Sequence, residues 1–202
     1  MDLRAAALTG AGLLVSGIAA VSGGLVTGYG LGPFAILLRI GLWWLALGAL
    51  TAFAPPNSIK MATKHAVTGV LILFVIGCSL MYYDLAVTPP ENGTPLTFPL
   101  LVSTQLEFLS ITLPIPAGYL AGVLVSDDKS LVAALTFLAV LVASPMVSAQ
   151  IAVAGGFAPG FAGAFFFTAT VVVSGFALVP LCLMGWIDPG ARTADIGTVA
   201  TD

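Results

Sequence analysis

The stretch that decides the fold is residues 96–125, LTFPLLVSTQLEFLSITLPIPAGYLAGVLV. A transmembrane helix needs about 20 consecutive, predominantly apolar residues, and this stretch is longer than that. Its one charged residue is Glu107, which lies far from both ends. An ionisable side chain inside a membrane span is energetically costly and faces protein or water rather than lipid. We therefore expect Glu107 to have a partner elsewhere in the chain.

The composition of the whole chain is typical of a membrane protein. Of its 202 residues, 59% are hydrophobic and only 7% are charged, whereas soluble domains average about 25% charged residues. The net charge of −3 offers no basic surface to nucleic acid. The sequence therefore predicts an integral, multi-pass protein of the cell membrane whose first partner is the lipid bilayer.

Apolar segments long enough to cross a bilayer recur along the chain. They predict an all-α bundle of six transmembrane helices, at about 5–27, 31–53, 65–87, 96–125, 131–153 and 161–187. We expect one transmembrane domain over residues 1–187 and a short polar, disordered tail over 188–202. The link over 54–64 is polar and carries two lysines, so we expect it to lie outside the membrane.

The basic residues outside these segments predict the orientation. With six helices they all fall on the side that holds both termini: Arg4, Lys60, Lys64, Lys129 and Arg192. Positive residues favour the cytoplasmic side of a membrane. We therefore predict that both termini are cytoplasmic. The link over 84–95 has no lysine or arginine, which agrees with its placement on the opposite side.

The first predicted helix carries a small residue at every fourth position. This small-residue ladder consists of Gly12, Ser16, Ala20, Gly24 and Gly28. Small residues at that spacing form a flat stripe on which another helix can pack closely. The ladder therefore predicts a helix-packing face on the first helix.

Prolines lie inside the last three predicted helices but not inside the first three beyond their first turn. They are Pro114 and Pro116, then Pro145, then Pro180. An interior proline removes a helix hydrogen bond and frees the carbonyl four residues earlier. Such kinks fit a mobile, cavity-lining half of the bundle, and they fit ordinary packing equally well.

Arg39 is the one basic residue inside any predicted helix, and it is the partner we expect for Glu107. Both side chains start about 12–14 Å below the outer ends of their helices, at 1.5 Å per residue. Each buried charge alone would cost at least about 2.5 kcal/mol. Equal depth and opposite charge therefore predict an interhelical ion pair between Arg39 and Glu107.

Uncharged polar residues near the predicted pair suggest a polar cavity in the outer half of the bundle. They share a helix face with Glu107 or reach a similar depth: Ser103, Ser110, Gln150 and Thr168. Such a cavity would admit a small solute, an ion or a proton. The alternative is a purely structural ion pair that fixes how the helices pack.

The residue types that carry enzyme chemistry are not arranged for it in this sequence. The chain has no nucleophile–histidine pair, no cluster of metal ligands and no paired carboxylates inside a predicted helix, so we expect no catalytic site, metal or cofactor. His65 follows two lysines at a membrane edge and is expected to be interfacial. Cys78 and Cys182 are expected at different depths and therefore unpaired.

Three classes of function are weighed, and a membrane enzyme ranks last for the reasons just given. The first is a non-catalytic accessory or assembly subunit of a membrane complex, which would contact other membrane subunits, or a second copy of itself, through the small-residue ladder. The alternative is a small carrier or channel with its polar cavity around Glu107 and Arg39. A wet crevice that reaches Glu107 would favour the carrier, and a dry, sealed bundle with the small-residue face of the first helix turned outward would favour the subunit.

Overall fold

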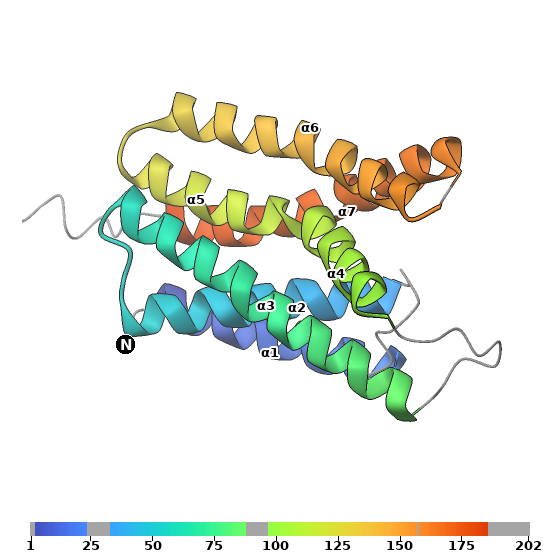
Figure 1. The fold of residues 1–202 in the computed structure, drawn as a ribbon. Coiled ribbons are helices and arrows are strands. Elements are labelled where there is room, and N and C mark those ends of the chain that lie inside the picture. The colour runs from blue at the N-terminus through green and yellow to red at the C-terminus, as the bar shows by residue number, and fades with distance from the viewer. Residues whose placement is uncertain (1–2, 24–32, 88–96, 157, 186–202) are drawn as a thin grey trace, which may run out of the picture.

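The chain folds into a bundle of helices, seen in a computed structural model that describes residues 3–23, 33–87, 97–156 and 158–185 (Figure 1). The helices are α1 Leu3–Gly23, α2 Pro33–Phe53, α3 Ile59–Val87, α4 Phe98–Thr112, α5 Pro114–Ser126, α6 Ser130–Ala154 and α7 Pro159–Gly185. Within these ranges, six stretches are long and apolar enough to cross a membrane, with α4 and α5 together forming the fourth. The predicted fold of six membrane-spanning helices is confirmed.

The third helix begins earlier than the sequence predicted. α3 starts at Ile59 rather than near residue 65, so the link after α2 covers only residues 54–58. The Ser58 carbonyl accepts hydrogen bonds from the Met61 and Ala62 amides at 3.0 Å each, which begins the helix. Lys60 and Lys64 lie on its exposed face. A membrane-spanning helix can carry lysines in its first turns, because their long side chains reach the polar membrane interface.

The fourth span is broken at Leu113, between α4 and α5. Pro114 has no amide hydrogen and cannot bond to the carbonyl of Ser110. That carbonyl accepts instead from the Leu113 amide at 3.4 Å and from the hydroxyl of Ser144 on α6. The break therefore leaves no unpaired backbone acceptor at Ser110. Figure 1 shows α4 inclined to the direction of α5.

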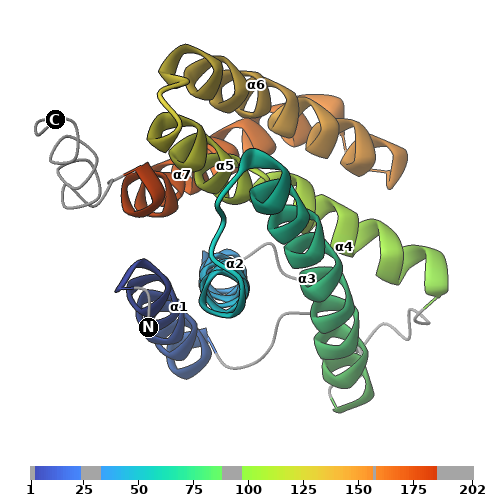
Figure 2. The same ribbon diagram turned by 90° about the vertical axis from the view of Figure 1, so that its left-hand side faces the viewer.

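The broken span is the centre of the bundle. α4 packs on α2, α3, α6 and α7, and α5 packs on α2, α3, α6 and α7 as well. α1 packs mainly on α2 and lies at one edge, whereas α6 lies at the opposite edge (Figure 2). The outward faces of the peripheral helices carry exposed aliphatic side chains, among them Leu13, Val75, Leu138 and Val171. An apolar outer surface of this kind suits contact with the lipid tails of a bilayer.

The hairpin of α1 and α2 is closely packed at glycines. A β-carbon at Gly12 would lie 2.6 Å from the amide nitrogen of Leu45, and one at Gly48 would lie 2.5 Å from the hydroxyl of Thr9. Ser16 contacts Gly41 in the same way. Gly12 and Ser16 of the small-residue ladder therefore face α2 of the same chain and are not free to dock a partner. Ala20 is half-buried, and Gly24 and Gly28 lie outside the described residues.

Candidate functional site

Three side-chain hydrogen bonds join α2 to the broken fourth span. Their members on α4 and α5 are spaced by seven residues, so they share one face of that span. We call this set the α2 seam: Arg39 Nη2 to Gln105 Oε1 at 2.8 Å, Trp43 Nε1 to Thr112 Oγ1 at 2.9 Å, and Thr51 Oγ1 to Tyr119 OH at 2.9 Å. All six residues are buried. The seam therefore pairs three polar side chains of α2 with three of the broken span.

Glycines on α3 make room for two side chains of the α2 seam. A β-carbon at Gly77 would collide with Oε1 of Gln105, and one at Gly69 would lie 2.7 Å from the ring of Trp43. Both glycines lie on the α3 face that packs against the seam. The close approach of α3 therefore depends on the absence of these side chains and helps to exclude water from the seam.

Arg39 lies in a dry and tightly packed site. Its guanidinium carbon is 3.5 Å from the centre of the Phe108 ring, a cation–π contact, and only 6% of the residue is exposed. Gln105 continues the contact by donating from Nε2 to the sulfur of Met81 at 3.4 Å. The cavity beside Arg39 has a volume of about 10 Å³, close to the least that holds one water. No solute fits there.

The predicted ion pair between Arg39 and Glu107 is wrong. Within the described ranges no ion pair joins the two residues, and Arg39 bonds to Gln105 instead. Residues two positions apart in an α-helix point about 200° apart, since each residue turns the helix by about 100°. The face of α4 that meets α2 therefore holds Gln105 and Phe108, and Glu107 points away. Arg39 therefore contacts the turn of α4 that its depth predicted, but on the face that holds Gln105.

Glu107 faces the end of α6. Its Oε1 lies 3.8 Å from the position that a β-carbon on Gly155 would occupy, and Gly155 is the C-cap residue directly after α6. Only 7% of Glu107 is exposed. Its carboxylate has neither a hydrogen bond nor an ion pair among the residues that the structure describes. It is a buried acid without a donor, beside the link between α6 and α7.

A serine cluster lies one turn below Glu107, between α4 and α6. Ser144 donates to the carbonyl of Ser110, and Oγ of Ser148 is 2.8 Å from Oγ of Ser110. Ser110 in turn donates to the backbone carbonyl of Glu107 at 2.8 Å. All three serines are buried; the hydroxyls of Ser110 and Ser148 bond to each other, and that of Ser144 bonds to the Ser110 carbonyl. The cluster satisfies the carbonyl that Pro114 frees, which is a structural role.

The predicted polar cavity does not form, because its four candidate residues point to different places. Ser110 belongs to the serine cluster, and Ser103 is half-buried. Gln150 is exposed and lines an apolar groove of about 710 Å³ between α6 and α7. Thr168 is exposed and lines a different groove, between α2 and α7. Arg39 and Glu107 therefore do not share a chamber with them.

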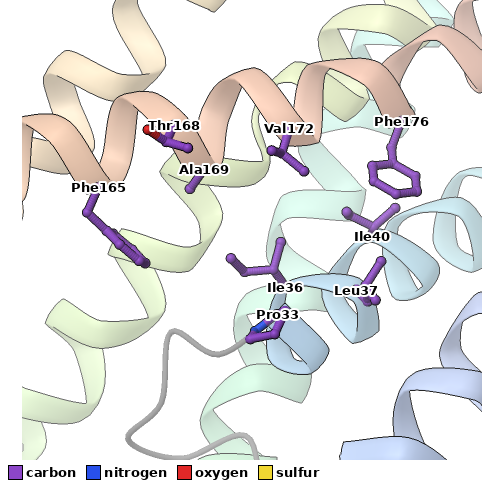
Figure 3. Close-up of a pocket in the computed structure, with 9 residues that line it drawn as sticks. All are labelled: Pro33, Ile36, Leu37, Ile40, Phe165, Thr168, Ala169, Val172 and Phe176. Carbon is purple, nitrogen blue, oxygen red and sulfur yellow. The ribbon is translucent and has the colours of Figure 1, made fainter.

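The second of these hollows, the α2–α7 groove, has a volume of about 370 Å³ and is open. Figure 3 shows its nine lining residues: Pro33, Ile36, Leu37, Ile40, Phe165, Thr168, Ala169, Val172 and Phe176. Thr168 has the one polar side chain among them, and its hydroxyl already donates to the carbonyl of Ala164 at 2.9 Å. The groove therefore suits an apolar occupant.

His65 lies inside the bundle and not in the interface that the sequence suggested. It is 5% exposed, and its Nδ1 lies 2.9 Å from the hydroxyl of Tyr119. Thr51 gives its hydroxyl hydrogen to the carbonyl of Leu47 at 2.7 Å. Tyr119 also bonds to Thr51, so His65, Tyr119 and Thr51 form a chain of side-chain hydrogen bonds. Each of these groups is satisfied by its neighbour.

Sequence reasoning missed Gln105, Thr112 and Tyr119, which carry the α2 seam. Their signal was present as three hydrogen-bonding residues at a spacing of seven in an apolar segment. The charge of Glu107 drew attention to the neighbouring face instead. A polar residue with a partner is favoured at a helix–helix contact, whether or not it is charged.

The described ranges hold no group of three histidine, cysteine, aspartate or glutamate residues that could bind a metal ion. Cys78 and Cys182 are free thiols. Comparisons with protein-family models, with curated protein sequences and with solved structures found no match to this chain.

Proposed function

We propose that this chain is a non-catalytic subunit of a membrane complex and that a transmembrane helix of a partner packs into its α2–α7 groove. The observation that carries the proposal is a contrast inside one molecule. The cavity beside Arg39 in the polar interior has a volume of only about 10 Å³. The open groove between α2 and α7 has a volume of about 370 Å³.

The α2 seam argues against a solute path through the bundle. A carrier needs polar groups that can exchange one partner for the solute. Here Arg39 is occupied by Gln105 and by the ring of Phe108. A path between α2 and α4 would have to break these contacts and strand a cation in a low-dielectric interior, which is costly.

The shape and chemistry of the groove support a helix as its occupant. Its floor includes Ala169, which is buried, while Val172 and Phe165 form its sides on α7. Helices associate in membranes mainly through close packing at small residues, because lipid tails are as apolar as leucine. The groove offers such a depression in a lipid-facing surface. Lipid chains alone in the groove are the competing outcome that the experiment must separate.

The test compares membrane complexes in cells that lack this chain and in cells that carry variants of it. Blue native electrophoresis of solubilised membranes should show a complex that is lost without the chain and restored by the wild type. Val172→Trp should fill the groove and prevent restoration. Leu178→Trp is the matched control, since both residues are exposed aliphatics on α7, at 56% and 50%, and Leu178 lies outside the groove.

Restoration by both variants would leave lipid as the occupant and overturn the docking proposal. Loss with both variants would point to a general defect of α7, so each variant is first checked for wild-type abundance in the membrane. An unchanged set of complexes in the deletion strain would overturn the subunit function itself.

A cation carrier is the second candidate, and one observation favours it. Glu107 is buried without a hydrogen-bond donor near the α6–α7 link. Intramembrane carboxylates of this kind occur on proton and ion paths. Purified protein in sealed vesicles with an internal pH dye would report such a path. Flux that is present in the wild type and lost in Glu107→Gln would support the carrier, and equal leakage in both would remove it.

A further inference from the structure

We infer that Glu107 and the last turn of α6 form a binding site for one monovalent cation, either a sodium ion or a proton. This site goes beyond the subunit function, because it would serve a static subunit and a carrier alike. It rests on the geometry around Gly155 and on the charges in that part of the bundle.

Three oxygens lie near the position of a β-carbon on Gly155, and two of them are carbonyls of α6 itself. Seen from the position of a β-carbon on Gly155, the three nearest heavy atoms outside its own neighbours are the carbonyl oxygen of Ala152 at 3.3 Å, that of Ile151 at 3.6 Å and Oε1 of Glu107 at 3.8 Å. Backbone carbonyls and a carboxylate are hard ligands of the kind that hold alkali and alkaline-earth ions. The Glu107 carboxylate faces this space, and 7% of the residue as a whole is exposed.

The electrostatics of this place disfavour an unneutralised carboxylate. The last carbonyls of a helix form its negative end, and negative side chains are destabilised there. The Glu107 carboxylate has no hydrogen-bond donor to offset this repulsion. A buried carboxylate without a partner destabilises the folded protein, because it has lost its hydration. A cation between the carboxylate and the carbonyls would remove both costs.

No described side chain supplies that charge. α6 has no titratable residue, and α7 has only Cys182, near its other end. Arg39 on α2 lies on the opposite face of α4 and is bonded to Gln105. The remaining titratable side chains described on the helices packed against α4 are Lys60, Lys64, His65, Cys78, Tyr82 and Tyr83 on α3 and Tyr119 on α5. Of these, His65 and Tyr119 bond to each other. Lys60 and Lys64 lie beside His65 in the first two turns of α3.

The single negative charge selects a monovalent ligand. One carboxylate and one monovalent cation give a neutral site, whereas a divalent ion would leave a net positive charge buried among apolar helices. Sodium and the proton share this chemistry and compete for the same oxygens. A bound proton removes the charge and converts the carboxylate into a hydrogen-bond donor.

The test measures the thermal unfolding of the purified full chain in lipid nanodiscs. Sodium chloride is varied at constant ionic strength with choline chloride, and pH is varied separately. A ligand that binds only the folded state raises the melting temperature with the logarithm of its concentration above the dissociation constant. A proton held by the folded state and released by the unfolded chain gives a melting temperature that falls as pH rises.

Two variants locate the response. Glu107→Gln keeps the shape and removes the charge, so its melting temperature should not respond to sodium or to pH in this range. Gly155→Ala places a methyl group among the three oxygens, and its backbone (φ −79°, ψ 0°) accepts alanine without strain. It should weaken the response. Gly160→Ala is the control, because a β-carbon there has nothing within 4 Å.

The responses of the four proteins distinguish a sodium site, a proton site and no site. A sodium response in the wild type and in Gly160→Ala, reduced in Gly155→Ala and absent in Glu107→Gln, identifies sodium. A pH response with the same pattern, together with an infrared band of a protonated carboxyl that Glu107→Gln removes, identifies the proton. If Glu107→Gln does not fold, the comparison of Gly155→Ala with Gly160→Ala carries the test. Equal responses in all folded variants, or no response in the wild type, would overturn the site.

Discussion

Arg39 on α2 donates a hydrogen bond to Gln105 on α4 at 2.8 Å, and Glu107, two residues further along the same helix, faces α6 instead. The two faces of α4 therefore have different tasks. One face joins α2 through the seam, and the other carries a buried acid and the serine cluster. Because of this division, Arg39 has a hydrogen-bond partner on α4, whereas the charge of Glu107 is not neutralised by any described side chain.

The bond between Arg39 and Gln105 should appear as a coupling energy. We expect Arg39→Leu and Gln105→Leu each to destabilise the protein, because each leaves a buried polar group unpaired. In a double-mutant cycle of unfolding free energies the pair should couple by about 1.5–3 kcal/mol, as hydrogen bonds to charged groups do.

The control for that cycle pairs Arg39→Leu with Thr51→Val. Thr51 also lies in the α2 seam but is three turns away and bonds to Tyr119. Their effects should add to within about 0.5 kcal/mol. Coupling as large as that of Arg39 with Gln105 would mean that the seam responds as one unit and that the pairwise description is incorrect.

The close packing of α1 on α2 predicts a difference between two glycines of α1. A β-carbon at Gly12 would meet the backbone of Leu45, whereas one at Gly10 would have nothing within 4 Å. We expect Gly12→Leu to force the helices apart and cost about 1–3 kcal/mol, as overpacked cores do. Gly10→Leu should unfold like the wild type in a thermal melt. Similar melting temperatures for the two variants would exclude this packing.

The pattern of the small-residue ladder showed that α1 has a packing face but not whose helix covers it. Spacing along one helix carries no information about the partner, and here the partner is α2 of the same chain. In the same way, the apolar segments predicted the spans because burial in lipid depends on length and composition alone. The start of α3 was missed because two lysines suggested a link, although they lie on the exposed face of the helix.

The candidate site was harder to predict from sequence for a geometric reason. Depth follows from counting residues, and it placed Arg39 next to the correct turn of α4. The direction of a side chain depends on how each helix is rotated and tilted, and the break at Pro114 changes that tilt. An error of two residues turns the partner to the opposite face, as it does for Glu107 and Gln105.

The serine cluster should compensate for Pro114 in a measurable way. Ser144→Ala removes the side-chain donor to the Ser110 carbonyl, and an under-satisfied buried acceptor costs about 1–3 kcal/mol. In a Pro114→Ala background the new amide of residue 114 can bond to the same carbonyl, so Ser144→Ala should cost much less. Unfolding free energies of the four proteins measure this. An equal cost in both backgrounds would show that the hydroxyl does not serve the carbonyl freed by proline.

The charge distribution predicts that Lys129, between α5 and α6, faces the cytoplasm. Cysteines placed singly at Glu91 and Lys129, in a chain without Cys78 and Cys182, can be labelled with an impermeant thiol reagent on intact cells. We expect labelling at position 91 only, and at both positions after the membrane is opened. Labelling of position 129 on intact cells, with none at 91, would reverse the orientation. Position 91 lies outside the described residues, so its reactivity rests on the sequence alone.

The closure of the polar interior is the central claim of this account, because the choice of subunit over carrier depends on it. The most direct test places single cysteines at Thr112, which bonds to Trp43 in the α2 seam, and at Ser148 in the serine cluster; both residues are 0% exposed. Purified folded protein is treated with a small, water-soluble thiol reagent, with the exposed Lys129→Cys as the positive control. We predict rapid labelling at position 129 and none at 112 or 148 until the protein unfolds. Labelling of 112 or 148 in the folded protein at a rate near that of 129 would show a water-filled path through the bundle and contradict the account.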